Sequence, residues 1–219
     1  YWYKLPQVAI DRVEVLRSSG SDLYGADAVG GVVQVLTWHP SRLSARALVE
    51  GGGLGTGRIS MFGGGRSGGW SYTAGGEWFT TGGHVAVARK QDNGIAPRGP
   101  IDSNFGTKHR SGLASIQYQT GDGWHVNGSG SVFTDNRRNG TPLVINDTAS
   151  RQGTSEVAGG LAGGLLSARA FAGTQGYDQT FSAVSADRTS EDLNRRQRVP
   201  TRSSGTAAQW VRPFGRHTL

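Results

Sequence analysis

Residues 70–80 read WSYTAGGEWFT, and this stretch decides the fold that we expect for the chain. Even-numbered positions carry mostly apolar and aromatic side chains, whereas odd-numbered positions are mostly polar. The apolar set is Trp70, Tyr72, Ala74, Gly76 and Trp78, and the polar set includes Ser71, Thr73 and Glu77. Because successive side chains of a strand point to opposite faces, the stretch predicts a strand with one apolar and one polar face.

The same alternation recurs on both sides of this stretch. The expected strands are 44–52, 57–65, 70–80, 111–119, 124–134, 155–163, 165–177 and 203–212. Short glycine-rich turns are expected at 66–69, 120–123 and 163–164, and they alternate with long polar stretches at 81–106, 135–153 and 178–200. The connection at 53–56 is a short exception to this alternation. Short and long connections alternate in transmembrane barrels, but a soluble β-sandwich has no need for this pattern. The chain is therefore predicted to be all-β, with about eight antiparallel strands of an incomplete transmembrane β-barrel.

Aromatic side chains gather near both ends of the expected strands. Those at the short-turn end are Phe62, Trp70, Tyr118, Trp124, Trp210 and Phe214, and those at the long-loop end are Trp78, Phe79 and Phe133. Two aromatic girdles at the membrane interfaces predict this distribution. Aromatic packing inside a soluble β-sandwich is the alternative.

Composition limits the other classes. The 219 residues include 36 glycines and no cysteine, so a disulfide framework is excluded. No run reaches the ~18–20 apolar residues of a membrane helix, whereas barrel strands need only ~9–11 alternating residues. The formal charge of +7 favours an anionic partner or a solvated basic loop surface. The chain begins at Tyr1 rather than at methionine, and we expect it to be a piece of a longer protein.

Residues 10–37 read IDRVEVLRSSGSDLYGADAVGGVVQVLT, and they resemble the end of the plug domain of TonB-dependent outer-membrane receptors. The resemblance lies in IDRVEVLR at 10–17, in S-x-L-Y-G at 21–25 and in A-x-G-G-V-V followed by threonine at 28–37. Ser18-Ser19-Gly20 stands where the family often has Gly-Pro. The resemblance implies that residues 1–40 form the C-terminal part of a plug domain and residues 41–219 the N-terminal part of a barrel.

The resemblance also implies a plug motif with plug–barrel contacts, formed by Glu14, Arg17, Tyr24, Gly25, Gly30 and Gly31. The glycines suit left-handed or close-packed backbone, and Tyr24 suits a buried ring with a hydroxyl partner. Glu14 and Arg17 are three residues apart, so on a strand they face opposite sides. In the family the equivalent of Arg17 contacts glutamates inside the barrel wall. Glu50 and Glu77 face inward in the expected register, and a solvated Arg17 is the alternative.

The function implied by the resemblance is plug-gated, TonB-coupled import of a scarce solute such as a siderophore, cobalamin or a carbohydrate. Its expected location is the bacterial outer membrane, and its expected partners are a TonB-type energy-transducing complex, outer-membrane lipid and lipopolysaccharide. The ligand is expected to bind in the long loops 81–106, 135–153 and 178–200. Arg195, Arg196 and Arg198 lie in the third of these and suit lipopolysaccharide, an anionic ligand or solvent.

Other functions are less well supported by the residues. No nucleophile–base set, G-x-S-x-G elbow or histidine pair at metal-ligand spacing is present, so we expect no enzyme, cofactor or metal site. Gly25–Gly31 lacks the Lys-Ser/Thr of a phosphate loop, and no nucleic-acid partner is expected. The alternatives are a passive or gated porin, an adhesion barrel without energy coupling, or a soluble β-rich binding protein or enzyme. We expect that the piece does not fold alone, because open sheet edges and an apolar outer face would be exposed.

Overall fold

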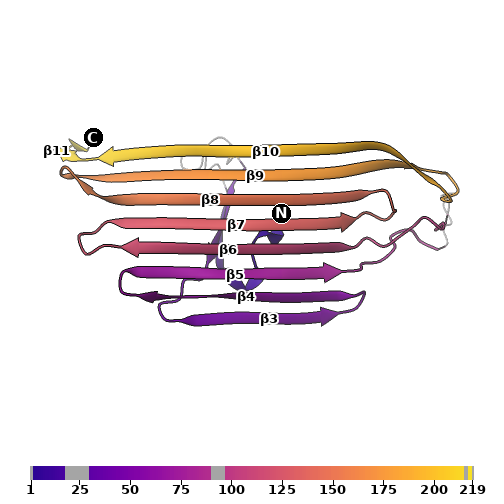
Figure 1. Ribbon diagram of the computed structural model, residues 1–219, viewed down its shortest axis with the longest axis horizontal. Helices are drawn as coiled ribbons and strands as arrows, with labels where there is room; N and C mark the ends of the chain where they lie inside the picture. Colours follow the sequence, from indigo (N-terminus) through magenta and orange to yellow (C-terminus); the bar gives the residue numbers. More distant parts are fainter. Residues whose placement is uncertain (1, 18–29, 90–96, 215–216, 219) are drawn as a thin grey trace.

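The computed structural model describes residues 2–17, 30–89, 97–214 and 217–218, and it confirms the all-β fold (Figure 1). One antiparallel sheet contains eight strands, each paired with its neighbours in chain order. The strands are β3 (Ser44–Gly52), β4 (Thr56–Ser67), β5 (Trp70–Thr81), β6 (Thr107–Gln119), β7 (His125–Arg138), β8 (Ile145–Leu161), β9 (Gly164–Val184) and β10 (Glu191–Val211). The helices within the described ranges are single 3₁₀ turns, and none is long and apolar enough to span a membrane.

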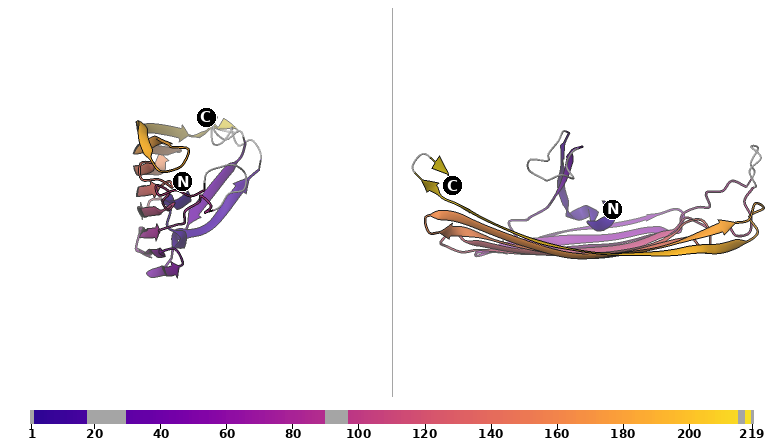
Figure 2. Two further views of the ribbon diagram at one scale, coloured as in Figure 1. Left: turned by 90° about the vertical axis from the view of Figure 1, so that its right-hand side faces the viewer. Right: turned by 90° about the horizontal axis from the view of Figure 1, so that it is seen from above.

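The N-terminal segment lies on the concave side of the curved sheet (Figure 2). It starts with two 3₁₀ turns, η1 (Trp2–Lys4) and η2 (Gln7–Ala9), and continues into a two-stranded antiparallel unit, β1 (Ile10–Leu16) and β2 (Val32–Thr37). The amide of Trp38, which follows β2, donates to the carbonyl of Ala9 in η2 (2.8 Å). At the other end of the chain, β11 (Pro213–Phe214) pairs with β12 (His217–Thr218).

The strand register confirms that the sheet has two unlike faces. Tyr72 lies opposite Ile116, and both side chains are on the convex face, with 41% and 51% of their surfaces exposed. Met61 and Val49 are on the same face and are exposed by 59% and 76%. Glu77, by contrast, is buried under the N-terminal segment on the concave face. An apolar face left open to the surroundings is the arrangement that lipid contact requires.

The strands extend further than hydrophobic alternation predicted. The predicted loop 81–106 is essentially confirmed, because β5 ends at Thr81 and β6 begins at Thr107. The predicted loops 135–153 and 178–200 are wrong, since only 139–144 and 185–190 connect the strands there. Apolar alternation marks the part of a barrel strand that meets lipid. Beyond that part the strand continues through polar residues, which are held by backbone hydrogen bonds and therefore show no alternation in the sequence.

The short turns are confirmed, but the aromatic girdles are only partly so. Ala162 and Gly163 have φ angles of 51° and 76°, as a two-residue hairpin turn requires. Trp70 and Tyr118 pack together on the convex face with ring centroids 4.5 Å apart.

Three of the predicted girdle residues face the concave side instead. Phe62 and Phe133 are buried there, with 1% and 2% of their surfaces exposed, and Phe79 stacks on His109. Phe79 follows Trp78 in one strand, so both cannot share a face. The side chain of Phe214 lies outside the described part.

Candidate functional site

The N-terminal segment is held to the sheet by a buried carboxylate. Glu77 projects from the concave face of β5, and its side chain is only 4% exposed. Its Oε2 accepts a hydrogen bond from the backbone amide of Gln7 (3.1 Å). Arg58 of β4 donates from Nη1 to Oε1 of Gln7 (2.5 Å) and to Oε2 of Glu50 (2.9 Å), with its Nε 3.9 Å from Glu77. Residues 3–9, which we term the docking segment, are therefore fixed by charged groups of the wall.

His109 completes this contact from the neighbouring strand β6. It is 2% exposed and donates from Nε2 to Oε1 of Glu77 (3.2 Å). Its ring stacks on Phe79 at 4.8 Å and contacts Tyr3 of the docking segment at 5.0 Å. Further along, Lys4 donates from Nζ to Oε1 of Gln175 on β9 (3.2 Å). We call Arg58, Glu77 and His109, together with the docking segment that they hold, the docking cluster.

The docking cluster is suited to holding and releasing a segment rather than to bond chemistry. A carboxylate taken out of water is tolerated only when charged and hydrogen-bonding partners surround it. Glu77 has such partners on the wall, but one of its hydrogen bonds comes from the docking segment itself. Displacing the segment therefore removes one of the donors of this carboxylate, so this hydrogen bond favours the docked state.

Of the plug motif predicted from sequence, Glu14, Arg17, Gly30 and Gly31 are described, and none of them belongs to the docking cluster. Glu14 is exposed and accepts from Nε of Arg12 (2.7 Å), and Arg17 is exposed after the end of β1. Gly31 has a φ of 137°, as expected for a position that favours glycine. Gly30 has open space around it, so packing does not require glycine there. The predictions for Tyr24 and Gly25 fall outside the described residues, and the plug–barrel role of Glu14 and Arg17 stays a prediction.

The inward orientation predicted for Glu50 and Glu77 is confirmed by the register. The wall partners of Glu77 and the docking residues Tyr3, Lys4 and Gln7 were missed. A pattern of alternation places Glu77 and His109 on the polar face, but it does not pair residues from different segments. The backbone amide of Gln7 carries no side-chain signal at all.

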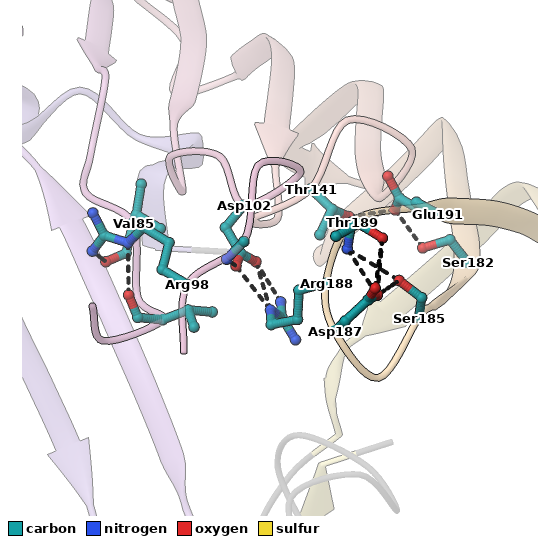
Figure 3. Close-up of polar contacts among 12 residues, drawn as sticks. Val85, Arg98, Asp102, Thr141, Ser182, Ser185, Asp187, Arg188, Thr189 and Glu191 are labelled. Atoms are coloured by element: carbon teal, nitrogen blue, oxygen red, sulfur yellow. Dashed lines mark hydrogen bonds and ion pairs between the residues drawn. The ribbon is translucent and has the colours of Figure 1, made fainter. Parts of the chain in front are cut away.

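The connections at the end of the sheet opposite the short turns are cross-linked by polar contacts (Figure 3). Arg188, between β9 and β10, donates from Nε to both carboxylate oxygens of Asp102 (3.0 and 2.8 Å) and from Nη2 to Oδ1. The amide of Gly99 also donates to Asp102 (2.8 Å). Arg98 donates to the carbonyls of Val87 (2.9 Å) and Val85 (3.2 Å), which ties two parts of the first loop together.

A second carboxylate ties the connection 139–144 to the same end. Glu191, the first residue of β10, accepts hydrogen bonds from the hydroxyls of Thr141 and Ser182 and from the amide of Leu143 (3.0 Å). Burial raises the pKa of Glu191, but these three hydrogen bonds outweigh it and leave the pKa below its ordinary value. All three of the loops predicted to bind ligand therefore contribute to one connected rim, although two of them are much shorter than predicted.

A hollow of about 1150 Å³ opens between this rim and the outer ends of β5 to β8. Its wall includes Arg137 on the concave face and, by register, Lys108, Arg138 and Asp147 on the convex face. Ser103 and Asn104 of the first loop supply polar groups. Arg137 is the basic group that the hollow offers on the concave side, and it favours an anionic ligand there.

The Asp102–Arg188 ion pair predicts how the rim responds to acid. Hydrogen bonds from Arg188 hold the pKa of Asp102 below its ordinary value of ~3.9, despite its burial. A lowered pKa stabilises the folded rim above pH ~4, and the stabilisation is lost as pH falls through the folded-state pKa. The hydrogen–deuterium exchange rates of the amides of Arg98, Gly99, Ile101 and Asp102, corrected for the intrinsic rate, should therefore be constant from neutral to mildly acidic pH. Asp102→Asn should raise these rates at neutral pH by about tenfold or more.

Asp122→Asn is the control for Asp102→Asn. Asp122 accepts from the hydroxyl of Thr120 within the short turn 120–123, at the other end of the sheet, so its loss should not affect 97–102. Equal effects of the two variants on residues 97–102 would contradict the cross-link.

A curved antiparallel meander with an apolar convex face and a segment docked on its concave face has the architecture of a β-barrel wall. No protein-family model matches the chain. Among curated proteins, the Vitamin B12 transporter BtuB of Photobacterium profundum is 28% identical to it over 125 residues. The aligned part covers 56% of this chain and 19% of that transporter, so it represents only a small share of the relative's length.

Proposed function

We propose that the chain is part of a plug-gated outer-membrane transporter that imports a scarce solute with energy from a TonB-type complex. The observation that carries the proposal is the docking cluster, in which Glu77 and His109 of the wall hold an N-terminal segment on the concave face of the sheet. A wide barrel needs such a plug, because its lumen would otherwise be an open channel. In this proposal residues 1–40 belong to the plug and residues 41–219 to the barrel wall.

The similarity to a vitamin B12 transporter supports transport as the function of the whole protein. Arg137, which lines the hollow on the concave side, supports an anionic solute such as a ferric siderophore. The similarity to a vitamin B12 transporter supports cobalamin as a second candidate. The cross-linked rim supports capture at the outer end, where three connections converge. Release of the docking segment would then open the path, and the force for that release would come from the energy-transducing partner.

Uptake into energised cells tests the proposal. Cells that express the protein with its native flanking sequences are given radiolabelled cyanocobalamin or a ferric siderophore, with and without a protonophore. We expect accumulation of one of these solutes and its loss when the proton gradient is collapsed. Accumulation that continues without the gradient would favour the alternative of a porin. Extraction of the protein from cells by buffer without detergent would contradict every barrel reading.

A further inference from the structure

Arginines recur at one height on alternate strands of the sheet. Arg110 lies nine residues before the end of β6 at Gln119, and Arg202 lies nine before the end of β10 at Val211. Arg151 lies ten residues before the end of β8 at Leu161. These ends are the short-turn ends of the strands, so the three arginines, here termed the arginine row, lie at the same distance from that edge to within one residue.

The register places the arginine row on the convex face. Arg110 is opposite Trp78, and Arg151 is opposite Val132, which is itself on the exposed apolar face. Thr174 of β9 is opposite both Arg151 and Arg202, so these two arginines lie on the same face two strands apart. A separation of two strands is about 9–10 Å.

The height of the arginine row matches a membrane boundary. Nine to ten residues at ~3.3 Å each, along strands tilted by ~40°, rise about 25 Å above the short turns. That is the height of the apolar band of an outer-membrane barrel. Below the row, β6 presents Ala114, Ile116 and Tyr118 on the same face. The guanidinium groups therefore stand where the acyl chains of the outer leaflet end and the headgroups begin.

The arginine row is available for an outside partner. All three side chains are exposed, and within the described ranges none of them forms an ion pair. Higher on the same face, Arg198 is bound to Asp178 (3.6 Å), whereas Lys108 and Arg138 add further exposed positive charge. Positive charge at an interface without enough acidic neighbours favours an anionic surface.

A shallow trough of about 980 Å³ adjoins the arginine row. Both Arg151 and Arg202 line it, and its lining includes the small residues Ala114, Gly130 and Gly153. Glycine and alanine leave room between strands that larger side chains would fill. The trough thus offers apolar space directly beside two cationic groups.

We infer that the arginine row and the trough bind a phosphorylated lipid of the outer leaflet, with its phosphate on the arginines and an acyl chain in the trough. This inference rests on the proposed function, because it takes the convex face as the lipid face and the loop end as the outer side. Guanidinium groups bind phosphate through paired hydrogen bonds, and these strengthen where water is scarce. The lipid would fix the height of the wall in the membrane.

The test uses the protein with its native flanking sequences, purified in detergent and incubated with bisphosphorylated lipid A. Native mass spectrometry counts the lipid retained. The triple variant R110Q/R151Q/R202Q should bind lipid A about tenfold more weakly. The matched control R66Q/R169Q/R195Q removes three charges from the concave face and should bind like the wild type. Dephosphorylated lipid A should bind the wild type as weakly as lipid A binds the triple variant, and excess inorganic phosphate should not displace lipid A.

Equal lipid retention by both triple variants, tight binding of dephosphorylated lipid A, or dimers in place of lipid adducts would each overturn the inference. Displacement by inorganic phosphate would overturn the role of the trough. Membrane fractionation and solute uptake are measured on the same variants. If the wild type does not retain lipid A but is found in the outer membrane and imports solute, only the inference about the arginine row is wrong. Absence of the wild type from the outer membrane would instead refute the proposed function.

Discussion

Replacing Glu77 by alanine is expected to free the docking segment from the wall. The change removes the acceptor of the Gln7 amide and the partner of His109, in a place where water reaches little of either side chain. Breaking a buried charged contact costs about 3 kcal/mol or more. The amide of Gln7 should then exchange with deuterium about a hundredfold faster, at tenfold for each 1.4 kcal/mol. The measurement is made on the protein with its native flanking sequences in detergent.

Glu50→Ala is the matched control, because Glu50 is a second carboxylate bound to Arg58 on the same face. Its side chain is 51% exposed, and an exposed ion pair contributes only about 0.2–1 kcal/mol. Exchange at Gln7 should therefore change by less than about tenfold in Glu50→Ala. If Glu77→Ala leaves this exchange unchanged, or if both variants raise it equally, Glu77 does not hold the segment.

The faces of the wall were predictable from sequence because they follow from the period of a strand. In 70–80 the alternation of Trp70 and Tyr72 with Ser71 and Thr73 correctly separates the convex from the concave face. The same period shows why the girdle assignment of Phe79 was wrong, since Phe79 directly follows the outward Trp78 in β5. Strict use of the alternation would have placed Phe79 beside Glu77 and indicated an aromatic cluster inside the wall.

Contacts between distant segments were not predictable from one sequence. Asp102 and Arg188 are 86 residues apart, and nothing in either stretch marks them as partners. The extra length of β8, β9 and β10 depends on ladders of backbone hydrogen bonds between polar residues, which have no hydrophobic period. The docking segment was missed for a similar reason, because its main tie is the Gln7 amide.

One residue of the wall, Arg137, lines the hollow and also contacts the docking segment. It donates from Nε to Oδ2 of Asp135 (2.6 Å) and lies 5.8 Å from the ring of Tyr3. Asp135 is itself 1% exposed and also accepts from Thr107 (2.9 Å). An anion in the hollow would share this guanidinium with Asp135 and Tyr3. The geometry thus links the place of capture to the segment that must move.

Replacing Gly140 by alanine is expected to unpack the rim around this hollow. Gly140 has a φ of 89°, which L side chains rarely adopt, and it is buried. An added methyl group would overlap the ring of Phe105. Backbone strain at such a φ angle costs about 1–3 kcal/mol, and the exposed ring of Phe105 must also shift to make room. The amide of Ser103, which donates to the Gly140 carbonyl (2.8 Å), should therefore exchange about thirtyfold faster.

Gly176→Ala is the control for this change, since Gly176 lies within β9 near the same end of the sheet and has open space where a Cβ would be. In Gly176→Ala the amide of Ser103 should exchange at the rate found in the wild type. Because Ser103 lines the hollow, Gly140→Ala should also weaken capture of the imported solute, whereas Gly176→Ala should not. Wild-type exchange at Ser103 in Gly140→Ala would mean that the 139–144 connection does not support the first loop. If Gly140→Ala changes exchange at Ser103 but leaves solute capture unchanged, the rim does not contribute to solute binding.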